Sequence, residues 1–280
     1  MTSSQQHWDS RHRESSSHAP PAPAPFLVES FPLLPTPHPR SRALDLACGA
    51  GQNSVWLAER GWPVVAVDFA PAALDRAAAL AASRGLRVHR RPLPVEAALS
   101  RHPLSSVKAP ESIPPSSARR PSGAATPACP EERRACPEER RGCAPVPSAR
   151  HPLPAFPDRF SGLLLAEADL ETSALPAASF DLILCFHYLH RPAFPEIERA
   201  LLPGGFLLLE TFTVGAHAFP CVRPPVETSE AQHGLPEGPH SPDHLLRRNE
   251  LRSAFPNLQT LFYRECTTPR AQATLLARKM

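Results

Sequence analysis

Two acidic residues and two glycines have the spacing of a cofactor-binding turn. An apolar run ends at Asp45, a stretch of small residues follows with Gly49 and Gly51, and a helical pattern begins directly afterwards. Because glycine lacks a Cβ, the backbone can bend sharply here and a ligand can approach it closely. A second apolar run, 63–67, ends in Asp68, 17 residues after Gly51. An acid at the end of the second strand of a β–α–β unit binds the hydroxyls of a ribose. The stretch therefore predicts a cofactor that contains a nucleoside.

The chemistry of the turn favours one cofactor over another. A dinucleotide-binding turn carries three glycines and receives a pyrophosphate on the following helix, whereas Ser54 occupies the third glycine position here. Asp45 lies beside the turn, where a carboxylate repels a pyrophosphate and attracts an ammonium group. S-adenosylmethionine (SAM) carries an ammonium group, a sulfonium and no phosphate. We therefore expect SAM, with a nicotinamide dinucleotide and a glycine turn without a ligand as the alternatives.

Alternating strand and helix patterns indicate the sheet that positions these residues. The alanine-rich stretch 71–82, which begins with proline and ends before Gly85, predicts a helix between two strands. The expected fold is α/β, with seven predicted strands. These strands cover 43–46, 63–67, 161–169, 180–186, 206–210, 258–264 and 271–278, and further helices are expected at 53–60, at 194–201 and in a stretch that ends near residue 255.

Five motifs follow one another along the chain: Asp45-Leu46-Ala47-Cys48-Gly49-x-Gly51, Val67-Asp68, Asp169-Leu170-Glu171, Tyr188-Leu189-His190-Arg191 and Leu275-Leu276-Ala277-Arg278-Lys279. On these motifs, residues 42–91 and 161–280 resemble a class I SAM-dependent methyltransferase, and within that class the group of tellurite-resistance methyltransferases. The resemblance implies a Rossmann-like, doubly wound sheet of seven strands, mostly parallel, with an antiparallel C-terminal hairpin. It implies that Asp45, Ala47 and the Gly49 and Gly51 backbone hold the methionine end of the cofactor. It also implies that Asp68 takes the ribose hydroxyls, with Phe69 against the adenine. Ala47 departs from the family pattern, which has glycine at that position.

Two stretches compete for the third strand of this fold. One begins near residue 161 and ends in Asp169-Leu170-Glu171, and the other is 87–90, followed by Glu96. In the resembled family an acid after the third strand bonds the adenine amino group. We expect Asp169 to be that acid, with Leu170 framing the adenine, because the next predicted strand follows at the usual distance. Glu96 is the alternative.

The stretch after the strand 180–186 supplies the candidates for the methyl-acceptor side. In the resembled fold Phe186, at the strand end, borders the cofactor, and the residues that follow face the methyl group. These are His187, Tyr188, His190 and Arg191. Either histidine can act as a base if the nucleophile must lose a proton, whereas a metalloid oxyanion or a thiol can react without one. The alternative for each is a side chain that ties loops together.

Two further segments flank or interrupt the expected methyltransferase domain, which covers 41–91 and 158–280. Residues 1–40 form an N-terminal extension in which Trp8-Asp9-x-Arg11 resembles the opening of small methyltransferases that folds over the cofactor. A cofactor-capping helix is expected here, and a frayed tail is the alternative. Residues 92–157 contain 15 prolines and a direct repeat of Ala-Cys-Pro-Glu-Glu-Arg-Arg. They are expected to form a disordered, low-complexity insertion, and the seven-residue spacing of Cys129, Cys136 and Cys143 reflects duplication better than a zinc site.

Composition limits the partners. The net charge of +3 resides entirely in the insertion, because the remaining residues carry 21 basic and 21 acidic groups, so nucleic-acid binding is not expected. No apolar run reaches the roughly 18 residues of a membrane span, and the expected location is cytoplasmic with reduced cysteines. We expect a small-molecule methyl acceptor and no metal. The alternative function is an interaction protein, with a methyltransferase-like scaffold and a partner-binding insertion.

Overall fold

The computed structural model describes residues 3–14, 22–91, 151–152, 160–214, 241–267 and 271–280. Almost all of the predicted insertion 92–157, with its three repeat cysteines and Glu96, lies outside the described residues. The expectation of disorder there therefore remains a prediction.

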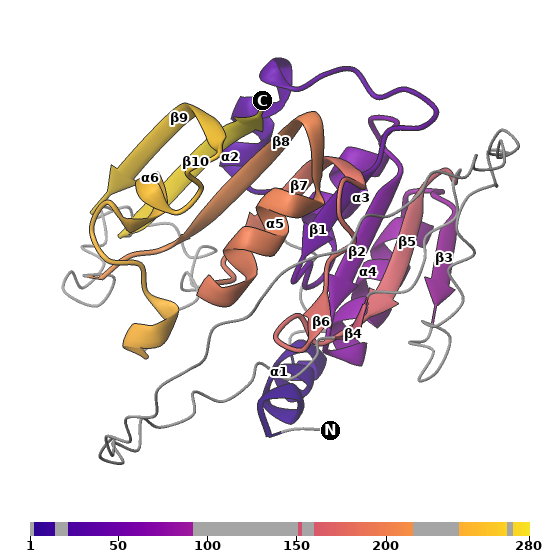
Figure 1. Cartoon of the computed structure of the whole chain (residues 1–280). Helices are drawn as coiled ribbons and strands as arrows, with labels where there is room; N and C mark the ends of the chain where they lie inside the picture. The colour runs from indigo at the N-terminus through magenta and orange to yellow at the C-terminus, as the bar shows by residue number, and fades with distance from the viewer. Residues whose placement is uncertain (1–2, 15–21, 92–150, 153–159, 215–240, 268–270) are drawn as a thin grey trace, which may run out of the picture. The chain divides into compact units, whose positions relative to one another are not determined.

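A single large sheet organises the described residues (Figure 1). Five pairings between neighbouring strands are parallel, and the two that join the last strands, β8 with β10 and β10 with β9, are antiparallel. The α/β fold and its C-terminal antiparallel hairpin are thus confirmed. From one edge to the other the strands are β3 (Val88–Arg91), β5 (Leu163–Glu167), β2 (Val64–Asp68), β1 (Ala43–Leu46), β7 (Phe180–Phe186), β8 (Leu201–Phe212), β10 (Gln272–Lys279) and β9 (Leu258–Cys266).

The sheet has eight strands rather than the predicted seven, because both candidates for the third strand belong to it. The strand β5 pairs directly with β2, with Leu163 opposite Val64, and β3 pairs with the outer side of β5. The burial of the two strands explains this order. Residues 163–166 of β5 are apolar and buried, as an internal parallel strand requires, whereas His89 and Arg90 of β3 are exposed and suit an edge.

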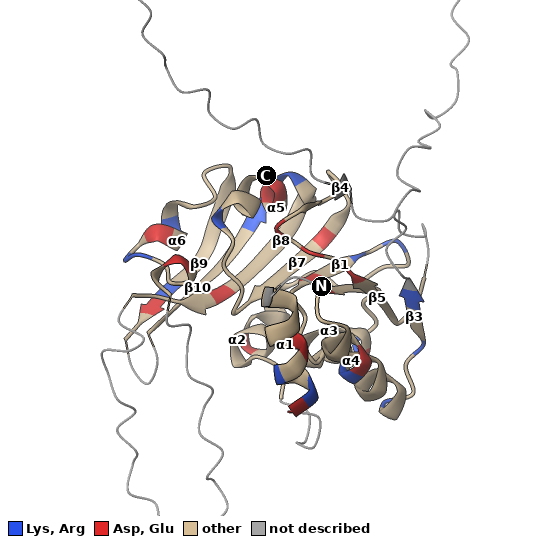
Figure 2. Cartoon of the chain, turned by 90° about the horizontal axis from the view of Figure 1, so that it is seen from below, with Lys and Arg blue, Asp and Glu red and all other residues tan. Residues whose placement is uncertain are grey.

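Helices cover both faces of the sheet (Figures 1 and 2). On one face lie α1 (Ser3–Glu14), α2 (Pro25–Ser30), α3 (Gln52–Ala58) and α4 (Pro71–Ser83), and on the other lie α5 (Phe194–Ala200) and α6 (Glu250–Ser253). The smaller elements are the 3-10 helices Phe31–Leu33, Arg191–Ala193 and Pro242–His244 and the two-residue strands β4 (His151–Pro152) and β6 (Ser173–Ala174), which pair with each other.

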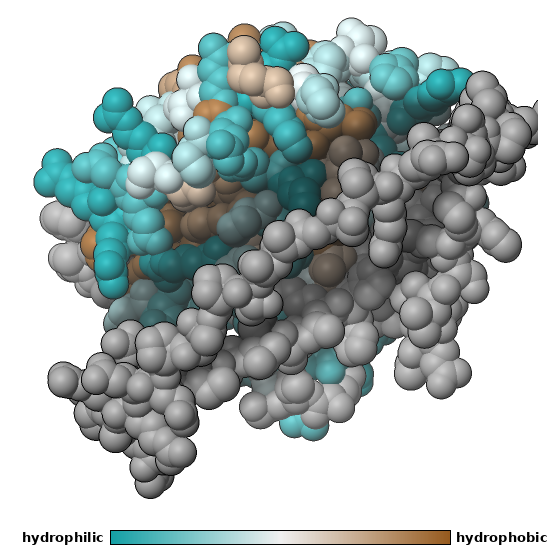
Figure 3. Space-filling model, in the orientation of Figure 1, coloured by the Kyte–Doolittle hydropathy of each residue, from teal (hydrophilic) through white to brown (hydrophobic). Residues whose placement is uncertain are grey.

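Strand residues alternate between two apolar clusters, one on each face. In β8, Leu207 and Leu209 pack with Phe194 and Ile197 of α5, whereas Leu208 packs in the cluster that contains α3 and α4 residues. This alternation is the two-residue period of a strand that is buried on both faces. Figure 3 shows the α5 side as a surface, where hydrophobic residues are interrupted by hydrophilic ones.

The C-terminal helix that the sequence predicts to end near residue 255 is a single short turn. The structure has a 3-10 turn at Pro242–His244 and then α6 at Glu250–Ser253, preceded by Asn249 with φ of 60°. The extended Leu245 ends the 3-10 turn and the left-handed Asn249 directly precedes α6, so one continuous helix does not form. The other predicted helices lie where they were expected.

The strand order reverses at one place in the sheet. From β1 the chain proceeds to β2 on one side, whereas β7 and β8 extend the sheet on the other. In open parallel sheets, ligands bind at the carboxyl ends of the two strands where the order reverses. Here those strands are β1 and β7, and β3 and β5 run toward the same edge, where α1 lies (Figure 1).

Candidate active site

The turn after β1 has the backbone that close approach of a ligand requires. Ala47, Gly49 and Gly51 have φ values of 54°, 55° and 77°, all in the left-handed region. At Gly51 a Cβ would lie 2.6 Å from the Cβ of Ala77 in α4, so only glycine fits there. Ala47 adopts a conformation that favours glycine, which explains why the family pattern has glycine at that position.

Asp68 joins the two turns that follow β1 and β2. Its carboxylate is buried and accepts hydrogen bonds from Gly49 N and from Ala70 N, each at 2.9 Å. Burial raises the pKa of Asp68, while the two backbone N–H groups and His12 act in the opposite direction. Phe69, the next residue, is half-buried at the same turn. The expected ribose-binding carboxylate thus lies directly beside the glycine turn.

Asp45 lies beneath the turn and has a partner that the sequence interpretation did not identify. Its carboxylate is 1% exposed and accepts a hydrogen bond of 2.5 Å from Ser54 Oγ. Burial raises the pKa of Asp45 to about 7, Ser54 acts against that shift, and the charge of Asp68 adds to it. Ser54 occupies the third glycine position, so the departure from a dinucleotide motif supplies a hydroxyl to this acid.

The helix α1 lies against both turns. Gln5 donates a hydrogen bond of 2.7 Å to Phe69 O, and Asp9 accepts one of 2.8 Å from Ala72 N in the first turn of α4. The ring of His12 lies 3.7 Å from the point that a Cβ on Gly49 would occupy. Burial lowers the pKa of His12, and the carboxylate of Asp68 counteracts this effect. The sequence pattern Trp8-Asp9-x-Arg11 pointed to this segment but not to these contacts.

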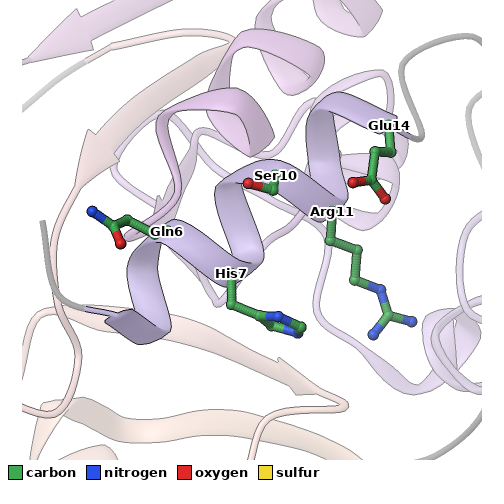
Figure 4. Close-up of a pocket in the computed structure, with 5 residues that line it drawn as sticks. All are labelled: Gln6, His7, Ser10, Arg11 and Glu14. Carbon is green, nitrogen blue, oxygen red and sulfur yellow. The ribbon is translucent and has the colours of Figure 1, made fainter.

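The opposite face of α1 borders a surface hollow (Figure 4). Its lining side chains point away from the helix axis and come from α1 alone: Gln6, His7, Ser10, Arg11 and Glu14. None of the predicted site residues lines this hollow, so it is not the site that the sequence motifs define.

The residues after β7 place a histidine in a strained and well-contacted position. His187 has φ of 57°, its N–H donates to Glu210 O at 2.7 Å, and its ring stacks on Phe212 with centroids 5.1 Å apart. Its Nε2 lies 3.1 Å from Gln272 Nε2 and 3.6 Å from Glu210 Oε1. Glu210 is a buried carboxylate that the sequence interpretation missed, because a single acid near a strand end gives no distinctive signal. Phe186 is buried at the end of β7.

Arg191 holds another part of the chain. Its guanidinium forms an ion pair with Glu250, with Nη2 2.9 Å from Oε2, and donates to Asp243 O and Leu245 O at 2.8 Å each. These contacts fix the segment 241–250 to the loop after β7. The rings of Tyr188 and His190 stack, with centroids 6.4 Å apart.

The adenine-side candidates lie at the end of β5. Asp169 Oδ1 accepts a hydrogen bond of 2.9 Å from Glu171 N, and Ala168 N donates to Asp68 O at 3.0 Å, so this turn adjoins the end of β2. Leu170 is buried in the apolar cluster on the α5 side of the sheet.

The site as a whole presents acceptors to a ligand that carries donors. Two buried carboxylates, Asp45 and Asp68, flank a turn that contains no lysine or arginine. In addition Gln52 Oε1, at the start of α3, is buried and has no hydrogen-bond partner among the described residues. These acceptors fit an ammonium group and ribose hydroxyls and oppose a pyrophosphate. The residues therefore fit SAM.

Two kinds of feature are not found in the part of the chain that the structure describes. There, no three or more His, Cys, Asp or Glu residues form a group that could hold a metal ion. Nor does any described helix have the length and apolar character needed to cross a bilayer.

Comparisons with known proteins agree with this site. Residues 24–259 match the methyltransferase domain family. A structure from work on the conversion of a disulfide bond into a thioacetal group during echinomycin biosynthesis is similar, with a TM-score of 0.51 and 16% identity over 98% of this chain and 91% of that one. TehB from Haemophilus influenzae is similar with a TM-score of 0.51 and 14% identity over 95% of this chain and 65% of that one. No curated protein sequence matches the chain.

The two solved structures establish the fold, and the family match extends over most of the chain. Together with the glycine turn and the buried acids Asp45 and Asp68, this identifies the cofactor as SAM. The chain belongs to the methyltransferase domain family and is a SAM-dependent methyltransferase with a class I fold.

Proposed function

We propose that the chain transfers the methyl group of SAM to a small-molecule acceptor at the carboxyl ends of β1 and β7. The observation that carries the proposal is the pair of buried carboxylates, Asp45 and Asp68, on either side of the glycine turn. The cofactor supplies a methyl group on a positively charged sulfur, which leaves with the bonding electrons. The protein binds and orients the reactants and excludes water from them.

Each predicted cofactor residue has a proposed role. Asp45 accepts hydrogen bonds from the ammonium group, and Asp68 accepts them from the ribose hydroxyls. Phe69 and Leu170 border the adenine, and Asp169 accepts a hydrogen bond from the adenine amino group. The support is their position around the joined turns of β1, β2 and β5. The remaining residues provide backbone and apolar walls: Ala47, Gly49, Gly51 and Phe186.

We also propose that α1 caps the bound cofactor, as part of an extension that covers residues 1–40. Its support is the hydrogen bond that Gln5 donates to Phe69 O and the one that Asp9 accepts from Ala72 N, together with the position of His12 beside Gly49. We assign the methyltransferase domain to 41–91 and 158–280. The free thiols of Cys48 and Cys185 suit a reducing compartment, and we place the protein in the cytoplasm.

The acceptor side comprises His187, Tyr188 and His190. Arg191 was predicted with them, and we propose that its part is to hold residues 241–250 beside the site, because Glu250 and two carbonyl groups occupy its guanidinium. A thiol or a metalloid oxyanion is the proposed acceptor class, since both are soft nucleophiles that attack a sulfonium methyl group readily.

Calorimetry with SAM, S-adenosylhomocysteine and NAD tests the cofactor site. The expected result is that the first two bind and NAD does not. Mass spectrometry after incubation with isotope-labelled SAM and panels of thiols, hydroxyl compounds and metalloid oxyanions then tests the transfer. Binding of NAD in preference to SAM would overturn the proposal.

A further inference from the structure

A buried carboxylate on the acceptor side has no evident structural purpose. Glu210 is 8% exposed and lies in the strand segment Phe206–Phe212, which is otherwise apolar except for Thr211. It lies two residues after Leu208 in the same strand, so its side chain points to the same face of the sheet, the face that carries α1 to α4. Burying a charge there is costly unless a partner compensates for it.

The ring of His187 lies beside this carboxylate and is held from several sides. Glu210 Oε1 lies 3.6 Å from Nε2, Gln272 Nε2 lies 3.1 Å from the same atom, and Phe212 stacks on the ring. The positive φ of His187 is a conformation that non-glycine residues seldom adopt and that clusters at functional sites. The backbone bond from His187 N to Glu210 O fixes the two residues relative to each other.

We propose that Glu210 is a positioning residue whose carboxylate, 3.6 Å from Nε2, stabilises the protonated ring of His187. His187 then serves as the base for an acceptor that loses a proton on methylation, a thiol or a hydroxyl compound. This inference rests on the proposed function, favours a thiol over a metalloid oxyanion and adds hydroxyl compounds to the acceptor class.

The step balances without a further reagent. The proton of the acceptor S–H or O–H moves to the imidazole of His187, and the freed electron pair forms the new bond to the methyl carbon. The bond between the methyl carbon and the sulfonium sulfur breaks, and its electrons remain on the departing sulfur. The imidazolium that forms is stabilised by the Glu210 carboxylate and returns its proton to solvent after the product leaves.

The charges around the pair disfavour a metalloid oxyanion. Glu29 of α2 and Arg264 of β9 are the other charged groups that act on Glu210. Burial raises the pKa of Glu210, Arg264 opposes this effect, and Glu29 adds to it. One cation against two carboxylates leaves an acidic surrounding, which repels an anion and attracts the imidazolium that a proton-losing acceptor generates.

The first test needs no cofactor. The pH titration of His187 is followed by NMR of the imidazole ring in the full chain, with the His187→Gln variant used to assign the signal. In Glu210→Gln the ring should titrate at a pH lower by about one unit or more, because a nearby opposite charge has been removed. Glu265→Gln is the matched control, since the Glu265 carboxylate bonds Asn249 N and Tyr263 Oη instead. An unchanged midpoint in Glu210→Gln overturns the inference.

The second test uses benzyl mercaptan, catechol and selenite as acceptor probes at saturating SAM. Benzyl mercaptan is an alkyl thiol, used in place of thiophenol because thiophenol is already ionised at neutral pH. In Glu210→Gln, kcat/KM for benzyl mercaptan and catechol should fall by about 10²-fold at neutral pH and recover at high pH, where the probes ionise by themselves. If kcat/KM for selenite exceeds that for both other probes and is unchanged by the Glu210→Gln substitution, the proposed acceptor class is overturned. Failure of SAM to bind in calorimetry would instead refute the proposed function, whatever the NMR titration shows.

Discussion

Replacing Asp45 by asparagine should stabilise the protein and abolish SAM binding at the same time. The Asp45 pKa of about 7 exceeds its ordinary value of 3.8 by roughly three units. Each unit corresponds to about 1.4 kcal/mol, so the buried charge costs about 4 kcal/mol at pH 8. Asparagine keeps the shape and the bond from Ser54 Oγ, but leaves an amide N–H group to satisfy, at about 1–3 kcal/mol. The expected net gain is about 2 kcal/mol, or roughly 5 °C in Tm.

The pH dependence of that gain has a definite sign. Because the folded protein holds a proton on Asp45 that the unfolded chain releases, the stabilisation from that proton is complete below pH 3.8 and is lost as the pH rises to about 7. The asparagine variant lacks this loss. Its advantage should therefore grow between pH 4 and 7 and stay constant above.

Urea unfolding at several pH values, combined with calorimetry for SAM, measures both effects. Asp75→Asn is the control, because its carboxylate is 64% exposed, pairs only with Arg90 among the described contacts, and should change stability by less than about 0.5 kcal/mol. An asparagine variant at position 45 that is less stable than the parent at pH 8, or whose advantage does not vary with pH, would refute the reasoning.

Three further perturbations test other parts of the site. Asp68→Ala should weaken SAM binding by about 1–3 kcal/mol and also lower Tm, because Gly49 N and Ala70 N lose their acceptor; calorimetry and thermal unfolding measure the two losses, and unchanged SAM affinity would contradict the ribose assignment. Arg191→Ala should lower stability by about 1–3 kcal/mol by leaving Glu250 and two carbonyls without their donor. Calorimetry of the folded variant should show SAM affinity close to that of the parent. The control is Arg199→Ala, at an exposed arginine on α5, which should change neither stability nor SAM affinity. Replacing residues 92–157 by a Gly/Ser linker should preserve SAM binding, provided that the linker returns from the end of β3 to the parallel start of β5, about 10 Å back along the strands at roughly 3.3 Å per residue. A soluble protein that no longer binds SAM would place the segment in the active site.

The sequence predicted most of the sheet because its strands are short apolar runs bounded by glycine, proline or an acid. The choice between the two candidate third strands was posed wrongly, since β3 and β5 both belong to the sheet. Whether Asp169 or Glu96 bonds the adenine remains a prediction, because Glu96 lies outside the described residues.

The candidate site was predictable only where a local motif carries it. The turn with Gly49 and Gly51 is local, and the structure places both at positive φ. The contacts of Asp9 with Ala72 and of His187 with Glu210 join residues 63 and 23 positions apart, so no local pattern encodes them. The start of the helix α6 depends on a distant residue in the same way. The backbone N–H of the left-handed Asn249 donates to Glu265 on β9, a contact that residues 242–255 alone do not reveal.

The two edges of the sheet differ in a way that matters for handling the protein. At β3 the exposed Arg90 presents a charge to any approaching strand, whereas β9 exposes Leu261 and Phe262 at 44% and 39%, with the charged Arg264 two residues further on. An edge strand with exposed apolar side chains is a template for intermolecular β-pairing once the chain unfolds locally. Heating should therefore lead to association through β9 that competes with refolding. The apparent Tm then depends on scan rate and protein concentration, and denaturant titration is the sounder route to free energies of unfolding for this chain.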